Sequence, residues 1–219
     1  MRYRTAVFDF DGTIADTREP ITLSANRALA ERGFAERPPA DVLELVGLPL
    51  AEVLRRLAEL PAGDGEVDEL CVHYRAAFRE LAPGRSALFD GIVDVIEQLV
   101  AAGVRLSIAT SRSRESLENF LDEHALRAHF VFWAGGHCIT NGKPHPEMLA
   151  YVLAGSGFAR EEAIMIGDTS HDIEMGHAAG VDTCAVSYGN HDADRLRRSE
   201  PTFLVHATHE LPRVVLSHA

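Results

Sequence analysis

The residues Arg4-Thr-Ala-Val-Phe-Asp-Phe-Asp-Gly-Thr13 lead from an apolar run directly into a polar turn. The part up to Phe10 has the composition of a buried strand, and the part from Asp11 onward has that of a turn. Asp9 and Asp11 therefore stand where a strand opens into a loop, and an ionised carboxylate buried there needs a compensating partner. An isolated Asp-x-Asp-Gly is more often a plain turn, so this pair alone decides no function.

The pattern becomes helical from about Asp16 to Leu81. Apolar residues recur with helical spacing in four segments, and glycine or proline ends each segment. These ends lie near Gly33, Gly47, Pro61 and Pro83. The sequence therefore predicts a small helical bundle without strands, inserted after the first strand.

Strand-like and helix-like segments alternate after Gly84. The apolar runs are Val104–Ala109, Phe130–Trp133, Ala163–Ile166 and Thr183–Val186, with amphipathic segments between them. Such alternation predicts an α/β, Rossmann-like core, in which a parallel sheet carries helices on both faces. Ligands of such sheets bind at the carboxyl ends of the strands, so those ends are where functional residues are expected.

Hydroxyl and amine groups follow two of the predicted strands. Thr110 and Ser111 come directly after the run 104–109, where free amides and hydroxyls at a helix start can bind an anion. A serine there also commonly caps the helix, and the two roles can coexist. Lys143 follows the run 130–133; most lysines are solvated, but an ammonium at this sheet edge could hold a phosphate and neutralise carboxylates.

Two further acids follow the run 163–166. Asp168 stands at its end, and Asp172 comes four residues later in the first turn of a predicted helix. Acids in a first turn commonly serve only to stabilise the helix dipole. Opposite Asp9 and Asp11, however, they complete an all-oxygen site of the kind that magnesium prefers.

The composition excludes several function classes. The 219 residues carry a formal net charge of −12, which argues against nucleic acid or an anionic membrane as a partner. No apolar stretch reaches the roughly 20 residues of a membrane-spanning helix, and the N-terminus lacks the features of a signal peptide. Three widely spaced cysteines fit a reducing compartment. We therefore expect a cytoplasmic protein.

The order and spacing of these groups resemble the haloacid dehalogenase superfamily, in particular its phosphoglycolate phosphatase-like branch with a helical cap. The matching residues are Phe8–Thr13 for the first motif, Thr110 for the second, Lys143 for the third, and Gly167-Asp168 with Asp172 for the fourth. The resemblance covers essentially the whole chain. It implies an α/β core of residues 1–15 and 84–219, and a helical cap of residues 16–83.

The resemblance also implies a magnesium-dependent phosphatase. Asp9 would attack phosphorus and form an aspartyl-phosphate, while Asp11 would protonate the leaving oxygen and then deprotonate water. Asp9, Asp168 and the backbone carbonyl of Asp11 would hold Mg²⁺, and Asp172 would support that shell or Lys143. The implied phosphate-binding residues are Gly12, Thr110, Ser111 and Lys143, and Lys143 would also assist catalysis.

Other functions remain possible within this resemblance. The acid–base group Asp11 disfavours carbon–halogen cleavage, and the insert lacks the lysine that phosphonate hydrolysis uses in this family. A phosphomutase of the β-phosphoglucomutase type shares the same core, and a non-catalytic metabolite-binding relative is the other alternative.

The partner is expected to be a small phosphorylated metabolite. Phosphoglycolate, a sugar phosphate, a nucleotide monophosphate and pyrophosphate all remain open as substrates, and the sequence predicts no oligomeric state. Basic residues in or around the insert could meet a second anionic group of the substrate, or they could be solvated helix faces. They are Arg37, Arg55, Arg56, His73, Arg75 and Arg79.

Overall fold

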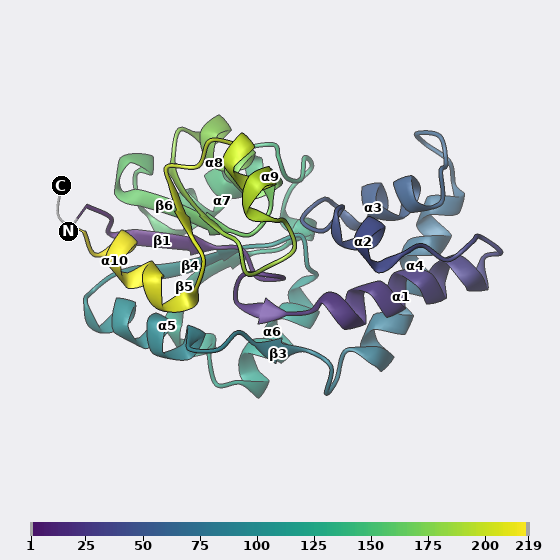
Figure 1. Ribbon diagram of the computed structural model, residues 1–219, viewed down its shortest axis with the longest axis horizontal. Helices are drawn as coiled ribbons and strands as arrows, with labels where there is room; N and C mark the ends of the chain where they lie inside the picture. The colour runs from purple at the N-terminus through teal and green to yellow at the C-terminus, as the bar shows by residue number, and fades with distance from the viewer. Residues whose placement is uncertain (1, 218–219) are drawn as a thin grey trace.

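The computed structural model describes residues 2–217, and a parallel sheet forms the centre of its larger part (Figure 1). The strands are β1 (Thr5–Phe8), β4 (Arg105–Ala109), β5 (Phe130–Ala134), β6 (Ala163–Gly167), β7 (Asp182–Val186) and β8 (Phe203–Val205). Their order is β5-β4-β1-β6-β7-β8, and every neighbouring pair is parallel. Strand β1 therefore lies between β4 and β6, and the carboxyl ends of all three meet at one edge.

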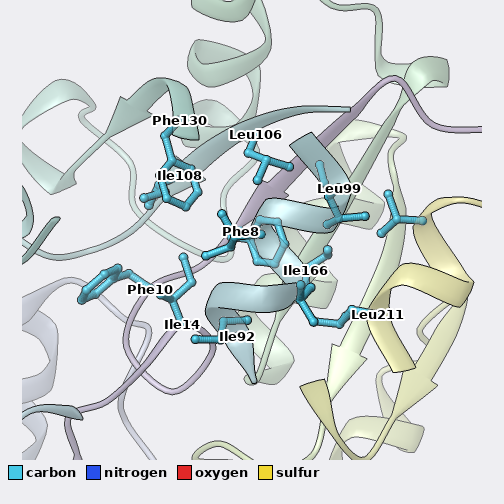
Figure 2. Close-up of a cluster of buried hydrophobic side chains, with 14 of the residues drawn as sticks. Phe8, Phe10, Ile14, Ile92, Leu99, Leu106, Ile108, Phe130, Ile166 and Leu211 are labelled. Atoms are coloured by element: carbon cyan, nitrogen blue, oxygen red, sulfur yellow. The ribbon is translucent and has the colours of Figure 1, made fainter. Parts of the chain in front are cut away.

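One face of the sheet is covered by α5 (Ile92–Ala101), α6 (Arg114–Glu123) and α10 (Leu211–Val215). Figure 2 shows this cluster: Phe8, Ile108 and Ile166 of three strands meet Ile92 and Leu99 of α5. All of these side chains are fully buried. Each such side chain contributes about 1.5–3 kcal/mol through its burial, so this face fixes the position of β1.

The opposite face is covered by α7 (Glu147–Ser156), α8 (Ser170–Ala179) and α9 (Ala193–Arg198). Val7 and Met165 point to this side, where they pack with Met148 of α7 and Met175 of α8. Successive residues of a strand point to opposite faces, which is why Val7 and Phe8 belong to different clusters. The buried, continuously apolar sequence of β1 follows from this double cover.

The insert forms a separate group of helices beside the sheet, at the right of Figure 1. They are α1 (Arg18–Glu31), α2 (Pro39–Leu43), α3 (Leu50–Leu57) and α4 (Glu66–Leu81). Their apolar faces share one cluster, with Leu29, Leu54 and Leu70 at its centre. The segments that enter and leave the insert form a short antiparallel pair of strands, β2 (Ala15–Asp16) and β3 (Ala87–Leu88).

The predicted α/β fold is confirmed, with the insert after the first strand. The prediction of an insert region without strands was wrong at its edge, because β2 ends at Asp16. A two-residue strand has no periodicity that a sequence could display. The same reason applies to the unpredicted β8, which has three residues. Short 3₁₀ helices complete the fold: η1 (Arg127–His129), η2 (Gly136–Cys138), η3 (Arg160–Glu162) and η4 (Thr208–Glu210).

Among residues 2–217, no helix combines the length and the apolar character that crossing a bilayer requires.

Candidate active site

The predicted site residues converge at the carboxyl edge of the sheet. Asp9 and Asp11 follow β1, Thr110 follows β4, and Asp168 follows β6. Because β4 and β6 flank β1, groups from distant parts of the sequence become neighbours there. Lys143 enters the same edge from the segment between β5 and α7.

Lys143 is the only lysine of the chain, and its side chain is fully buried. Its Nζ lies 2.6 Å from Asp9 Oδ1 and 2.6 Å from Asp172 Oδ1. Burial alone would lower the pKa of Lys143, but the Asp172 and Asp9 carboxylates outweigh burial and raise it. The ammonium therefore stays charged and holds two carboxylates at fixed positions.

The Asp172 carboxylate both caps the start of α8 and binds Lys143. Its Oδ2 accepts hydrogen bonds from Thr169 N at 3.0 Å and from Thr169 Oγ1 at 2.7 Å, which satisfies a free amide at the start of α8. Its Oδ1 accepts from Lys143. A side chain on Gly167 would place its Cβ 2.4 Å from Asp172 Cγ, so glycine is needed there for the close approach. Asp172 thus orients Lys143 from a helix terminus.

Asp168 is held by donors on both sides. Its Oδ1 accepts from Thr13 Oγ1 at 3.0 Å, and its Oδ2 accepts from Asn190 N at 2.7 Å and Asn190 Nδ2 at 2.8 Å. Burial, followed by the neighbouring Asp172 carboxylate, raises the pKa of Asp168 to about 7 despite these donors. Gly12 has φ +92°, and a Cβ on it would lie 2.1 Å from Asp168 Oδ2, so this loop accepts only glycine.

The carboxylates in this site outnumber the cations. Asp9, Asp168 and Asp172 each offer an oxygen within 4.8 Å of the others, against the single ammonium of Lys143. Burial raises the pKa of Asp9; Lys143 opposes this shift, and Asp172 and Asp168 add to it. A hard divalent cation would relieve this excess of negative charge, and oxygen ligands are those that magnesium prefers. The donor set therefore fits a magnesium ion.

The backbone carbonyl of Asp11 lies beside this acidic cluster. Asn190 Nδ2 lies 3.4 Å from that oxygen and also donates to Asp168 Oδ2, so one amide connects the two groups. Asp172 accepts from Lys143 and Thr169 through its two oxygens, and Asp168 accepts from Thr13 and Asn190 through both of its own. Asp9, Asp168 and Asp172 are therefore the carboxylates that could hold a metal, and the Asp11 carbonyl is a neutral oxygen beside them.

The Asp11 side chain turns away from the acidic cluster toward Arg112. Arg112 Nη1 lies 2.6 Å from Asp11 Oδ1, and Thr17 Oγ1 donates to the same oxygen at 2.8 Å. The Arg112 side chain is only 7% exposed, and it lies over the rings of Phe10 from the core and Phe78 from the insert. Arg112 was not predicted as a site residue.

Thr110 and Ser111 occupy different positions relative to the site. Thr110 is buried, and its Oγ1 accepts from Arg112 N at 3.1 Å. Ser111 Oγ instead donates to Gly47 O of the insert at 2.7 Å. A second bond joins the same loop to the core: His191 Nδ1 accepts from Ser170 N, so Nε2 carries the proton and donates to Glu44 O at 3.1 Å. The segment 44–47 therefore rests on the carboxyl edge of the sheet.

A cavity of about 660 Å³ lies between the insert and the core. The insert contributes apolar lining such as Val46, Leu48 and Phe78, while Asp11 and Arg112 contribute charge from the core. This volume lies within the range of about 300–1,000 Å³ typical of small-molecule sites. A metabolite larger than a bare phosphate fits next to Asp11.

The basic residues of the insert fall into two groups. Arg37, Arg55, Arg56 and His73 pair with acids of the insert itself, namely Glu59, Glu52 and Glu31. Arg75 and Arg79 line the cavity and are exposed, and neither pairs with an acid among residues 2–217. Of the six predicted candidates, only these two line the cavity.

Arg112 and Asn190 are the contributors that sequence reasoning missed. Arg112 directly follows Thr110-Ser111. Its position in the loop after β4, at the edge of the sheet where ligands bind, could have identified it as a site residue. Asn190 follows Gly189 in the loop after β7, where no motif marked it. The bond from Asn190 to Asp168 requires a glycine at position 189, because a Cβ on Gly189 would lie 2.4 Å from Asp168 Oδ2.

The comparisons with known proteins agree with this geometry. The model of the haloacid dehalogenase-like hydrolase family matches residues 6–186. A 5'-nucleotidase of Pseudomonas aeruginosa is 32% identical over 218 residues, which cover 100% of this chain and 98% of the relative. Phosphoglycolate phosphatase 1 of the same organism is 30% identical over 209 residues, covering 92% and 76%.

The fold also has close structural neighbours. A hydrolase from Pseudomonas syringae superposes with a TM-score of 0.87 at 18% identity, covering 98% of this chain and 99% of that one. At this identity the likeness shows the fold alone. Together with the family match over residues 6–186, it leads to one conclusion: the chain is a member of the haloacid dehalogenase-like hydrolase family, with similarity to its phosphoglycolate phosphatases.

Proposed function

We propose that this chain is a magnesium-dependent phosphatase that hydrolyses a small phosphomonoester through an aspartyl-phosphate on Asp9. Membership in a hydrolase family supports the reaction class, and the names of the two P. aeruginosa relatives support phosphate esters as substrates. The observation that carries the proposal is the geometry at Asp9. A buried carboxylate lies 2.6 Å from the only lysine and within 4.8 Å of an oxygen of Asp168, at the open edge of the sheet.

The reaction would proceed in two displacements. A carboxylate oxygen of Asp9 forms a bond to phosphorus while the ester P–O bond breaks, and Asp11 gives its proton to the leaving oxygen. Water then attacks the phosphorus of the aspartyl-phosphate, Asp11 takes a proton from that water, and the Asp9 carboxylate leaves. Asp11 would have to turn from Arg112 toward the ester for these transfers, because its carboxylate now points to the guanidinium.

The remaining site residues would bind and orient the phosphoryl group. Lys143, held by Asp172, supplies positive charge beside Asp9, while Thr110, Ser111 and Gly12 supply neutral donors. The Gly12 amide now donates to Ala15 O at 2.8 Å and would have to be released for this role. When bound by Asp9, Asp168 and the Asp11 carbonyl, magnesium would neutralise charge on the phosphoryl oxygens. Ser111 would have to release Gly47 to take part.

The insert would act as a cap over this site. We assign residues 16–83 to the cap and residues 1–15 and 84–219 to the core. The bonds from Ser111 to Gly47 and from His191 to Glu44 support a closed arrangement, and opening would break both. Closure would exclude water while the substrate is held. The substrate is a small phosphorylated metabolite, phosphoglycolate-like or a sugar phosphate, and the location that we propose is the cytoplasm.

The test is phosphate release from a panel of phosphomonoesters, with magnesium and with EDTA. We expect turnover that requires the metal in the wild type and vanishes in Asp9→Asn. Asp68→Asn makes the same chemical change on the exposed surface of the insert and is expected to keep full activity. Asp9→Asn should remain folded, because it keeps the shape of the residue.

Three outcomes would contradict the proposal. Phosphate release that survives in Asp9→Asn would exclude Asp9 as the nucleophile. Transfer of phosphate to a second hydroxyl of a sugar phosphate, without release, would instead indicate a phosphomutase. Magnesium and substrate binding without any turnover would indicate a metabolite-binding protein.

A further inference from the structure

Arg112 is a buried cation to which the proposed reaction gives no role. It stands at the start of the loop after β4 and lines the cavity together with Asp11. Its side chain is 7% exposed, whereas surface arginines such as Arg114 reach 62%. Burying a guanidinium is costly unless a charged partner compensates it. The buried ion pair with Asp11 therefore makes Arg112 part of the site, unlike a solvated surface arginine.

The hydrogen bonds of Arg112 leave part of its guanidinium available. Nη1 donates to Asp11 Oδ1 at 2.6 Å, and Nε donates to Ser116 Oγ at 2.9 Å. Among the described residues 2–217, Nη2 has no hydrogen-bond acceptor. A guanidinium carries five N–H groups in one plane, and a planar anion can bind two of them at once.

Two aromatic rings fix the plane of this guanidinium. Its Cζ lies 5.1 Å from the ring centre of Phe10 and 4.8 Å from that of Phe78. Phe10 belongs to the core and Phe78 to the helix α4 of the insert, so the orientation of Arg112 depends on both parts. A cation held between two rings is poorly hydrated and is prepared to receive an anion.

Among the described residues 2–217, no other cation at the cavity is placed in the same way. Lys143 is committed to Asp9 and Asp172. Arg75 and Arg79 line the cavity but are exposed, so water screens their charge. Arg112 is thus the buried positive charge of the cavity that lies nearest to the acid–base group Asp11.

We propose that Arg112 is a specificity residue that receives an anionic group carried by the leaving group of the substrate. This inference rests on the proposed phosphatase function and adds a binding role for a residue of the core. The anion would bind the free edge of the guanidinium, while Asp11 turns from Arg112 to the ester oxygen.

The position of Arg112 limits where that anionic group can be. Asp11 must come within about 2.6–3.2 Å of the leaving oxygen to exchange a proton with it. Arg112 Nη1 now lies 2.6 Å from Asp11 Oδ1, and Asp11 can turn to the ester only by rotating its short side chain, so the guanidinium stays in the neighbourhood of that oxygen. A carboxylate on the carbon that bears the ester oxygen would reach Arg112, and one several bonds farther away would not.

The test compares two esters that differ in one charge, 2-phosphoglycolate and its amide, 2-phosphoglycolamide. We expect the wild type to prefer the carboxylate in kcat/KM by about 10- to 100-fold, since a charge-assisted hydrogen bond has this effect. Arg112→Gln should reduce this preference to about 3-fold or less. The ratio is informative because loss of the bond to Asp11 affects both esters alike. Arg75→Gln, a matched change at the exposed rim, should keep the preference.

Each alternative result has a defined meaning. A wild-type ratio near one overturns the inference without any variant, even if Arg112→Gln fails to fold. An unchanged ratio in Arg112→Gln, or a ratio lost only in Arg75→Gln, overturns it as well. If the wild type hydrolyses neither ester nor any other, the proposed function fails instead. The role of Arg112 is then decided by calorimetry: 2-phosphoglycolate should bind Asp9→Asn at least 10-fold more tightly than it binds Asp9→Asn with Arg112→Gln, and equal affinities would overturn the inference.

Discussion

Replacing Lys143 by methionine tests the electrostatic balance of the site most directly. Methionine has a similar length and no charge, so the change removes the ammonium and leaves the cavity nearly filled. Two buried carboxylates, Asp9 and Asp172, each lose a hydrogen bond of 2.6 Å to a charged donor. Removing one partner of a buried ion pair costs about 3–5 kcal/mol. This is a large part of the roughly 5–15 kcal/mol that stabilises a typical domain.

The cost should depend on pH in a defined direction. Burial and the neighbouring Asp172 and Asp168 carboxylates raise the pKa of Asp9 above that of the unfolded chain, and without the Lys143 ammonium nothing opposes this shift. A carboxyl whose pKa is raised by folding contributes stability that is lost as pH rises. The deficit of Lys143→Met should therefore be larger at pH 8 than at pH 5.5.

The assay is guanidinium unfolding followed by circular dichroism at both pH values, in EDTA so that no metal compensates the charge. Arg114→Met is the matched control, because Arg114 forms an exposed i,i+4 pair with Glu118 and is 62% exposed. Its effect should stay below about 1 kcal/mol. A loss of less than about 1 kcal/mol for Lys143→Met at pH 8, or a larger loss at pH 5.5, would refute this account of the site.

Three further predictions concern the proposed metal ligands. Gly12→Ala should abolish magnesium-dependent turnover and destabilise the fold by about 2–4 kcal/mol, because its Cβ would lie 2.1 Å from Asp168 Oδ2; thermal unfolding and phosphate release measure both. Gly33→Ala has a similar positive φ with open space around it, so it should cost only about 1–2 kcal/mol and keep activity. Asn190→Ala removes two hydrogen bonds to Asp168 and should raise the magnesium concentration for half-maximal activity by about 10- to 100-fold. Since the metal-free pKa of Asp168 is about 7 and the ligand must lose its proton, the stabilisation by magnesium, measured as the difference in Tm from EDTA, should grow between pH 6 and pH 8.

Each of these predictions has a result that contradicts it. Equal effects of the two glycine substitutions would show that the clash with Asp168 does not matter. An unchanged magnesium requirement in Asn190→Ala would remove Asn190 from the support of the metal site. Magnesium stabilisation that is equal at both pH values would mean that Asp168 is ionised throughout this range.

The sequence predicted those parts of the site that lie at the ends of long strands. Asp9, Thr110 and Asp168 each follow a run of four or five apolar residues, and a parallel sheet necessarily brings such ends together. Asp172 could be placed from its i+4 spacing. Lys143 could be placed at this edge because it follows the run 130–133, and its ammonium was predicted to neutralise carboxylates there. That Asp172 supports Lys143 was implied only by the family resemblance, because the segment between β5 and α7 has no periodicity.

The parts that the sequence did not predict depend on side-chain direction and on short segments. Ser111 and Arg112 are adjacent, yet one points to Gly47 of the insert and the other to Asp11. No pattern in a sequence distinguishes these directions. Similarly, Arg55 and Arg75 are both arginines of the insert, and only the fold shows that Glu52 neutralises the first while the second lines the cavity.

The single lysine has a practical consequence for observing this protein at work. Because every other long cationic side chain is arginine, reagents that react with side-chain amines have one target, Lys143. That amine is fully buried between two carboxylates, so it can react only when the surrounding structure opens. The labelling rate at this position, measured by mass spectrometry of the peptide that contains it, would report how often the active site opens to solvent and whether a bound ester keeps it closed.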